Sequence, residues 1–212
     1  MLNRLPADER RAQLVESALV IAEQRGVASV TVRAVAEEAG VSLGVVHYCF
    51  ENKEELLAVM GESLILQLSE SMRLAFGQVG HAPELRGLTG LRELLHIGIS
   101  AMWPLIEASP DRQLLTYELT ALALRHRAAG SVHDIAGRQY RTMDAEAVRF
   151  FSECARMAGV AWATPVDAIA RFGLAMLDGL ILRWLVDRDS EAVIVAMDEV
   201  VRQLATLAVQ EP

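Results

Sequence analysis

The sequence predicts an all-α chain of about nine helices, in which a small three-helix head precedes a larger helical bundle. Apolar residues recur at helical spacing along most of the 212 residues, and caps, glycines or prolines bound these segments. No segment alternates apolar and polar residues as a half-buried strand does. Ala, Leu, Val and Arg dominate while aromatic residues make up only 5%, which also favours helix. We expect the head over residues 1–55 and the bundle over residues 56–212.

The head is expected to contain three helices, each with its own start or stop signal. The first covers about Ala7–Arg25, where Gly26 provides a glycine stop. The second begins after Thr31, whose hydroxyl suits an N-cap, and ends at Gly40, because glycine adopts a left-handed turn without strain. The third follows Ser42, a second N-cap candidate, and runs to about residue 50.

The remaining helices belong to the bundle. Asn52 and Glu55 have the spacing of a capping box, which predicts that a fourth helix opens at Asn52 and runs to about Phe76. The segment 77–89 contains glycines and a proline and is expected to be a loop. Five further helices are predicted at about Leu91–Glu107, 109–127, Val132–Ala158, 164–187 and Ser190–Val209.

Charge and cysteine content restrict the possible functions. The net charge of −8, with a balance of −3 over the first 58 residues, is unlike that of a general nucleic-acid binder. Any DNA contact therefore depends on a few well-placed cations, and the only lysine, Lys53, lies at the predicted start of the fourth helix. Cys49 and Cys154 lie far apart without metal-ligand spacing. Because there is neither an apolar run of 18 residues nor a signal-peptide pattern, we expect a cytoplasmic protein without a membrane span.

Residues 31–57 have the layout of a DNA-reading helix-turn-helix, with a positioning helix, a turn at Gly40 and a recognition helix after Ser42. Small residues at the start of the recognition helix let the backbone approach a groove, and His47 offers polar atoms to a base edge or a phosphate. The helix starts near Arg33 and Lys53 suit phosphate contacts. The candidate DNA contacts are Thr31, Arg33, Ser42, Leu43, Gly44, Val45, His47, Tyr48 and Lys53. The alternative interpretation is a helical corner that only packs.

This segment resembles the N-terminal domain of the tetracycline-repressor (TetR) family. The resemblance rests on TVRxVA at 31–36, AGVS at 39–42, YxF at 48–50 and NKExL at 52–56, and it covers roughly residues 8–60. A DGL and RWL pattern at 178–185 also recurs in that family. The resemblance implies a DNA head formed by the first four helices and a dimer formed by the last two long ones. His47 stands where the family usually has tyrosine and Cys49 where it often has histidine, so both departures bear on the base sequence that is read.

Residues 165–209 are apolar on more than one face, which predicts burial on two sides. This pattern favours an isologous four-helix dimer interface over an ordinary monomer core. In such a dimer the two heads enter successive major grooves ~34–36 Å apart. The candidate interface residues are Ile169, Phe172, Gly173, Met176, Leu177, Leu180, Trp184, Met197, Val201 and Leu204.

The fifth to eighth helices are expected to enclose a ligand pocket. Aromatic residues and methionines mixed with a few polar groups suit an apolar ligand, although the same residues can equally form plain core. The candidate pocket residues are Met102, Trp103, Tyr117, Glu118, Met143, Phe150, Phe151 and Met176. Two acids in apolar surroundings, Glu118 and Asp178, need partners, and the candidate partners are Arg125, Arg171 and Arg183.

Enzymatic signatures are weak. The single Glu93-x-x-His96 motif lacks the second copy that a di-iron bundle needs, and no nucleophile elbow or phosphate loop is present. We therefore expect no enzyme, no metal and no cofactor. The sequence predicts a ligand-responsive transcriptional regulator that binds an inverted-repeat operator in double-stranded DNA. The resemblance to the TetR family implies that it is a repressor, which a small apolar or amphipathic ligand releases from that operator. Its other partner would be a second copy of itself, with no membrane involved. The alternative is a helical small-molecule-binding protein whose head no longer reads DNA.

Overall fold

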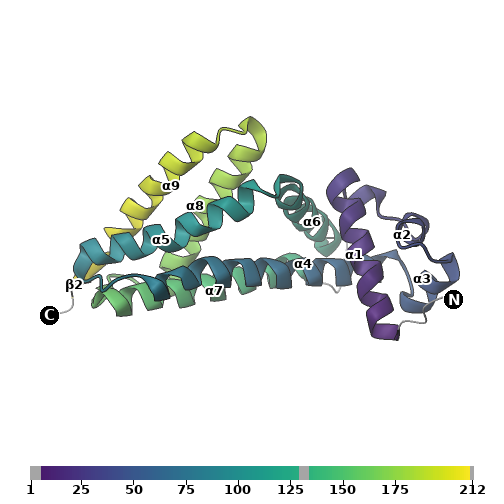
Figure 1. The fold of residues 1–212 in the computed structure, drawn as a ribbon, viewed down its shortest axis with the longest axis horizontal. Helices are drawn as coiled ribbons and strands as arrows, with labels where there is room; N and C mark the ends of the chain where they lie inside the picture. The colour runs from purple at the N-terminus through teal and green to yellow at the C-terminus, as the bar shows by residue number, and fades with distance from the viewer. Residues whose placement is uncertain (1–5, 129–133, 211–212) are drawn as a thin grey trace. The chain divides into compact units, whose positions relative to one another are not determined.

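The computed structural model describes residues 6–128 and 134–210. Over these residues the chain forms nine α-helices, two short 3-10 helices and two three-residue strands (Figure 1). The α-helices are α1 (Ala7–Arg25), α2 (Val32–Glu38), α3 (Leu43–Cys49), α4 (Lys53–Phe76), α5 (Gly87–Glu107), α6 (Pro110–Ala128), α7 (Ile135–Ala158), α8 (Val166–Asp187) and α9 (Ser190–Ala205). The 3-10 helices cover Val27–Ser29 and Gly77–His81, and the strands are β1 (Val160–Trp162) and β2 (Ala208–Gln210). The predicted helical class is thus confirmed.

The described residues form two compact units. Among these residues, the first unit comprises 6–66, 111–128 and 134–138, and the second unit comprises 67–110 and 139–210. Two polar contacts link α6 to the other elements of the first unit. Arg112 Nε donates to Glu23 Oε1 at 2.6 Å, and the Val27 N–H donates to Glu118 Oε2 at 3.0 Å. The domain boundary expected between residues 55 and 56 stays a prediction, because compactness does not show which segment folds independently.

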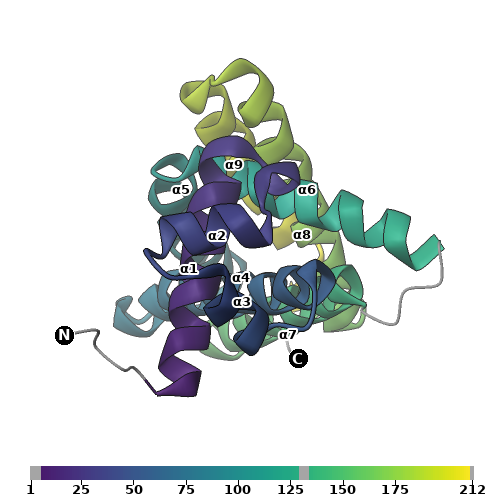
Figure 2. The same cartoon turned by 90° about the vertical axis from the view of Figure 1, so that its right-hand side faces the viewer.

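The core of the first unit is organised by one face of α1. Leu14 and Leu19 of α1 are fully buried and belong to one cluster with Val35 of α2 and Val46 of α3. α2 and α3 are only seven residues long, and helices of that length are unstable in isolation. Their stability therefore comes from this shared core, in which both lie close to α1 (Figure 2).

The core of the second unit is formed mainly by α5, α7, α8 and α9. The rings of Phe76 and Phe150 stack with centroids 4.2 Å apart, and Trp103 meets Trp184 edge to face at 5.2 Å. Gly98 lets α5 approach α7 closely, because a Cβ at this position would lie 2.2 Å from Phe150 Cε2. None of the helices in the described part of the chain has the length and apolar character needed to cross a bilayer.

The strands were not expected from the sequence, and that prediction was wrong. β1 and β2 pair antiparallel, with Val160 opposite Gln210 and Trp162 opposite Ala208. Three residues are too few for a period of two to be visible in the sequence. The pairing also explains why α9 ends at Ala205 rather than at about residue 209.

Helix starts were predicted with mixed success. The Thr31 hydroxyl accepts from the Ala34 N–H at 3.1 Å, as expected, but Ser42 makes no side-chain cap bond to α3. α9 begins at Ser190, as expected, and Asp189 caps it by accepting from the Ala192 N–H at 3.0 Å. The segment 77–89 is not entirely loop, since it contains a 3-10 helix and the start of α5 at residue 87. The start of a helix at residue 132 lies outside the described residues.

Candidate nucleic-acid interface

α3 is held to the fold by a single buried side chain, Val46. Val45 and Cys49 are half-buried, and the other four residues are exposed. They include two residues that usually contribute to cores: Leu43 is 43% exposed and Tyr48 is 82% exposed. Gly44 has open space at its Cβ position, where the nearest atom, Ser42 Oγ, is 3.9 Å away. A short helix that presents apolar, aromatic and glycine surface together is suited to contact another molecule.

The nine predicted DNA contacts all lie in the first unit, on α2, α3 and the residues that flank them. Val45 and Lys53 are half-buried, and the other seven are exposed. The Thr31 hydroxyl is already used as an N-cap. Arg33 and Lys53 form no ion pair with another described residue, so both cations remain available for phosphates. The predicted set thus lies within one short part of the first unit and is mostly exposed, while the DNA contacts themselves stay a prediction.

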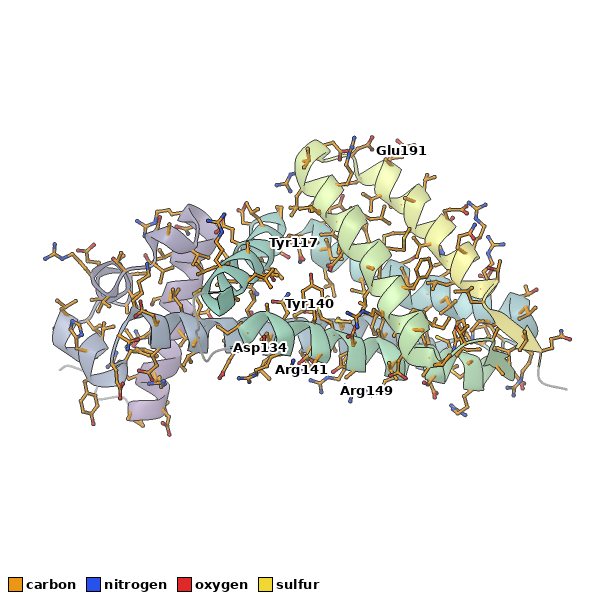
Figure 3. The ribbon with its side chains drawn as sticks, turned by 180° about the vertical axis from the view of Figure 1, so that it is seen from behind. Tyr117, Asp134, Tyr140, Arg141, Arg149 and Glu191 are labelled. Carbon is orange, nitrogen blue, oxygen red and sulfur yellow. The ribbon has the colours of Figure 1, made fainter. Side chains whose placement is uncertain are left out.

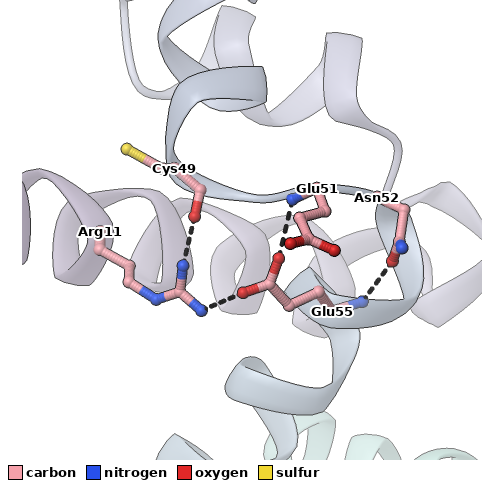
Figure 4. Close-up of polar contacts among 5 residues, drawn as sticks. All are labelled: Arg11, Cys49, Glu51, Asn52 and Glu55. Atoms are coloured by element: carbon pink, nitrogen blue, oxygen red, sulfur yellow. Dashed lines mark hydrogen bonds and ion pairs between the residues drawn. The ribbon is translucent and has the colours of Figure 1, made fainter.

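The corner between α3 and α4 is closed by a polar cluster (Figure 4). Arg11 of α1 donates to the Cys49 carbonyl and to Glu55 Oε1, the latter at 2.5 Å. The other carboxylate oxygen of Glu55 accepts from the Glu51 N–H at 2.7 Å. The Glu55 N–H donates to Asn52 Oδ1 at 2.8 Å, so the Asn52 half of the capping box is confirmed. The reciprocal half is displaced by one residue, because Glu55 reaches the N–H of Glu51 instead of that of Asn52.

The electrostatics of this corner follow from the same contacts. The hydrogen bond from Arg11 lowers the pKa of the Glu55 carboxyl, and the Glu51 N–H acts in the same direction. The guanidinium also lies over the Phe50 ring, 4.3 Å from its centroid. The sequence alone did not single out Arg11, because its partners lie 38 and 44 residues further along the chain.

The residues predicted to line a ligand pocket belong to both units. Trp103, Phe150 and Phe151 are buried in the core of the second unit, where Met102 and Met143 pack against that core. Tyr117 and Glu118 belong to α6 in the first unit, and Glu118 is engaged by the Val27 N–H. Met176 is 41% exposed on α8. The ligand pocket formed by these residues therefore stays a prediction. The Trp103 indole N–H is the one buried side-chain donor for which the described residues offer no acceptor.

Asp178 has a partner that the sequence did not suggest. The Tyr140 hydroxyl donates to Asp178 Oδ2 at 2.9 Å, and Arg183, one of the expected partners, pairs instead with Asp187 at 2.6 Å. Burial first, and then the Asp178 charge, raises the pKa of Tyr140 to about 12. Tyr140, on α7, is labelled in Figure 3.

Most residues predicted for the dimer interface are used by the chain's own core. Seven of the ten are buried within the second unit: Ile169, Gly173, Leu177, Trp184, Met197, Val201 and Leu204. Phe172 and Met176 are exposed, and Leu180 is half-buried. Helical spacing identifies an apolar stripe but does not show whether the chain itself or a partner covers it. The predicted interface therefore includes residues of the chain's own core together with exposed residues.

A second apolar face on α8 and α9 was missed. Val186 is 78% exposed, Val195 64% and Ile194 53%. Of these three residues, Val195 also lines a groove of about 730 Å³, together with Met176 and Leu180. No metal-binding cluster of His, Cys, Asp and Glu is present among the described residues.

Comparisons with known proteins agree with this geometry. Residues 14–60 match the sequence model of bacterial regulatory proteins of the tetR family. The chain is 26% identical over 184 residues to the HTH-type nicotine-responsive transcriptional repressor HdnoR of Paenarthrobacter nicotinovorans, an alignment that covers 87% of this chain and 88% of the relative.

Solved structures extend the likeness to nearly the whole chain. A putative TetR-family transcriptional regulator from Mesorhizobium loti matches with a TM-score of 0.75 at 15% identity, covering 97% of this chain and 99% of that one. The transcriptional regulator FadR from Bacillus subtilis, solved in complex with stearoyl-CoA, matches with a TM-score of 0.66 at 16% identity, covering 92% and 97%. At such identities these two likenesses concern the fold.

Proposed function

We propose that the chain is a member of the tetR family of bacterial regulatory proteins, whose model matches residues 14–60, and that it is a ligand-responsive repressor that binds an inverted-repeat operator as a homodimer. The observation that carries the proposal is the outward face of α3. Leu43, Gly44 and Tyr48 are presented to solvent although nothing in the fold requires it. In a helix-turn-helix protein this face enters the major groove, while neighbouring helix starts contact phosphates.

The mechanism follows from symmetry and linkage. A two-fold dimer presents two copies of α3 to half-sites ~34–36 Å apart. A ligand that binds better to an arrangement in which this spacing is lost lowers DNA affinity by its preference for that arrangement, tenfold for every ~1.4 kcal/mol. The exposed apolar face of Val186, Ile194 and Val195 supports a partner copy at α8 and α9.

The sense of regulation is supported by the relative from Paenarthrobacter nicotinovorans. Its name describes a repressor that responds to nicotine, and the alignment includes most of both chains. We therefore favour repression relieved by a small organic molecule with apolar and polar parts. The B. subtilis FadR complex shows the same fold holding a larger amphipathic ligand, stearoyl-CoA, and marks the wider range of ligands to be screened.

The proposal is tested by selection of random duplex DNA at low and moderate salt, followed by affinity measurements with the enriched duplex. We expect an inverted repeat to be enriched. Lys53→Ala should weaken binding and reduce the slope of log K against log salt by ~0.9 per bound head, the value for one lost phosphate contact. Arg92→Ala, which removes an exposed cation on α5 of the second unit, is the matched control and should leave the slope unchanged.

The second candidate, a small-molecule binder whose head does not read DNA, is favoured by the acidic balance of the first 58 residues. The same selection separates the two functions. A protein that binds a small organic ligand, yet enriches no duplex sequence at any salt concentration, would have this second function.

A further inference from the structure

We propose that Arg11 is a positioning residue for DNA reading, one that fixes the C-terminal end of α3 against α1 and the start of α4. The inference rests on the proposed function, since α3 is its recognition helix. It assigns no DNA contact to Arg11 itself. Its consequence is that a side chain on α1, outside the helix-turn-helix, sets how well the protein distinguishes its operator from other DNA.

Arg11 binds three groups around the α3–α4 corner. Its Nη1 donates to the carbonyl of Cys49, the last residue of α3, and its Nη2 pairs with Glu55 Oε1 at 2.5 Å. Its guanidinium plane covers the Phe50 ring, 4.3 Å from the centroid. The Glu51 N–H donates to the other carboxylate oxygen of Glu55 at 2.7 Å (Figure 4). Arg11 therefore fixes the Cys49 carbonyl directly and the Glu51 N–H through Glu55, on either side of Phe50.

Arginine is suited to this task in a way that lysine is not. The last carbonyls of a helix lack partners within the helix and carry the negative end of its dipole, so a cation with several donors stabilises them. The planar guanidinium supplies two donors in a fixed geometry and a flat face for stacking, whereas an ammonium group is a compact point charge on a flexible stem. Lysine at position 11 would keep the charge but could not hold Cys49, Glu55 and Phe50 together.

The clamp matters because α3 has few other anchors. Val46 is its one buried residue, and no side chain caps its N-terminus. Tyr48 directly precedes Cys49, and Lys53 lies two residues before Glu55. Arg11 therefore connects the end of the recognition helix to the start of the helix that carries the proposed phosphate contact. Without it, α3 can tilt about its Val46 contact, and the two sets of DNA contacts lose their fixed spacing.

Positioning and direct phosphate contact predict different salt dependence. The Arg11 and Glu55 side chains are each about one-third exposed, and the guanidinium already has a carboxylate partner. If Arg11 only positions α3, replacing it should leave the slope of log K against log salt unchanged. If Arg11 contacted a phosphate, its loss should reduce that slope by ~0.9 per head.

The experiment compares full-length wild type, Arg11→Lys and a stability control, Val15→Ala, which removes part of a buried α1 side chain but keeps Arg11 and the groups that it binds. Each is titrated with the duplex that wild type enriches and with a scrambled duplex of the same composition, at a temperature where all three are folded. For Arg11→Lys we expect the ratio of the two affinities to fall about tenfold, the effect of one mispositioned base-pair contact. The salt slope should stay unchanged, and Val15→Ala should keep the wild-type ratio.

A measurement without DNA accompanies the titration. Hydrogen exchange of the segment 43–55 should be faster in Arg11→Lys than in wild type, and less affected in Val15→Ala. An unchanged affinity ratio, a reduced salt slope, or an equal fall in Val15→Ala would each overturn the inference. If wild type enriches no sequence, the proposed function fails and the inference falls with it. That outcome is distinct from a failure of Arg11 alone, in which wild type selects a sequence and Arg11→Lys selects it equally well.

Discussion

Replacing Gly44 by alanine separates folding from DNA reading. Gly44 is the second residue of α3, and a Cβ built there meets only Ser42 Oγ, at an ordinary contact distance of 3.9 Å. The added methyl group therefore causes no clash within the chain. Because alanine is the better helix former, Gly44→Ala should raise the free energy of unfolding by up to about 1 kcal/mol.

The effect on DNA binding should have the opposite sign. If the backbone at Gly44 approaches base edges closely, the methyl group occupies space at the interface. Overpacking of this kind costs about 1–3 kcal/mol, which corresponds to a loss of about 5- to 150-fold in affinity for each bound head. Binding to a scrambled duplex, which depends mainly on phosphate contacts, should fall much less.

Thermal unfolding followed by circular dichroism, together with fluorescence anisotropy using the enriched and the scrambled duplex, measures both effects on one preparation. The expected result is an unfolding midpoint equal to or above that of wild type and a selective loss of affinity for the enriched duplex. A more stable variant with wild-type affinity would show that Gly44 faces away from DNA. The docking of α3 argued above would then be wrong.

Three other outcomes are expected. Gly98→Ala should lower the unfolding midpoint by about 2–12 °C, because its Cβ would lie 2.2 Å from a ring carbon of the buried Phe150; unchanged melting would show that the α5–α7 packing is looser than described. Val195→Glu should leave the melting of the subunit nearly unchanged, since the side chain is 64% exposed, but should split the dimer in light scattering, and a dimer that persists would place the interface elsewhere. The lowered pKa of Glu55 stabilises the folded head above the ordinary pKa of about 4.5, and this contribution is lost as the pH falls through the folded value. Glu55→Gln should therefore flatten the acid limb of stability against pH, and an unchanged limb would rule out this source.

The sequence predicted the parts of the first unit that depend on local signals. The bounds of α1 were correct because Gly26 ends it, and the Thr31 and Asn52 caps were correct because each bonds an N–H three residues further on. Arg11 was missed because its role depends on partners far along the chain, which come near only when α1 packs against the α3–α4 corner. Local chemistry can be read from spacing, whereas contacts between distant segments require the fold.

The second unit shows the limit of apolar periodicity. The sequence predicted where α8 begins and ends. It did not predict which apolar face of the helix a partner copy would cover. Trp184 and Met197 were assigned to an interface and are buried in the chain's own core, whereas Val186 and Val195 of the same helices were not assigned to it and are exposed. A helix that is apolar nearly all round has two stripes, and only the packed structure shows which one is already covered.

The strongest reason to see a binding surface in α3 is that its residues are poorly suited to the isolated fold. In natural proteins, local preference, capping and packing normally agree, and the exceptions gather at functional sites. α1 follows these rules, with a glycine stop and an apolar face in the core. α3 does not, since Ser42 leaves it uncapped, Gly44 weakens it, and Leu43 and Tyr48 face outward. None of these features stabilises the chain itself, and each is explained if α3 binds in the major groove of DNA.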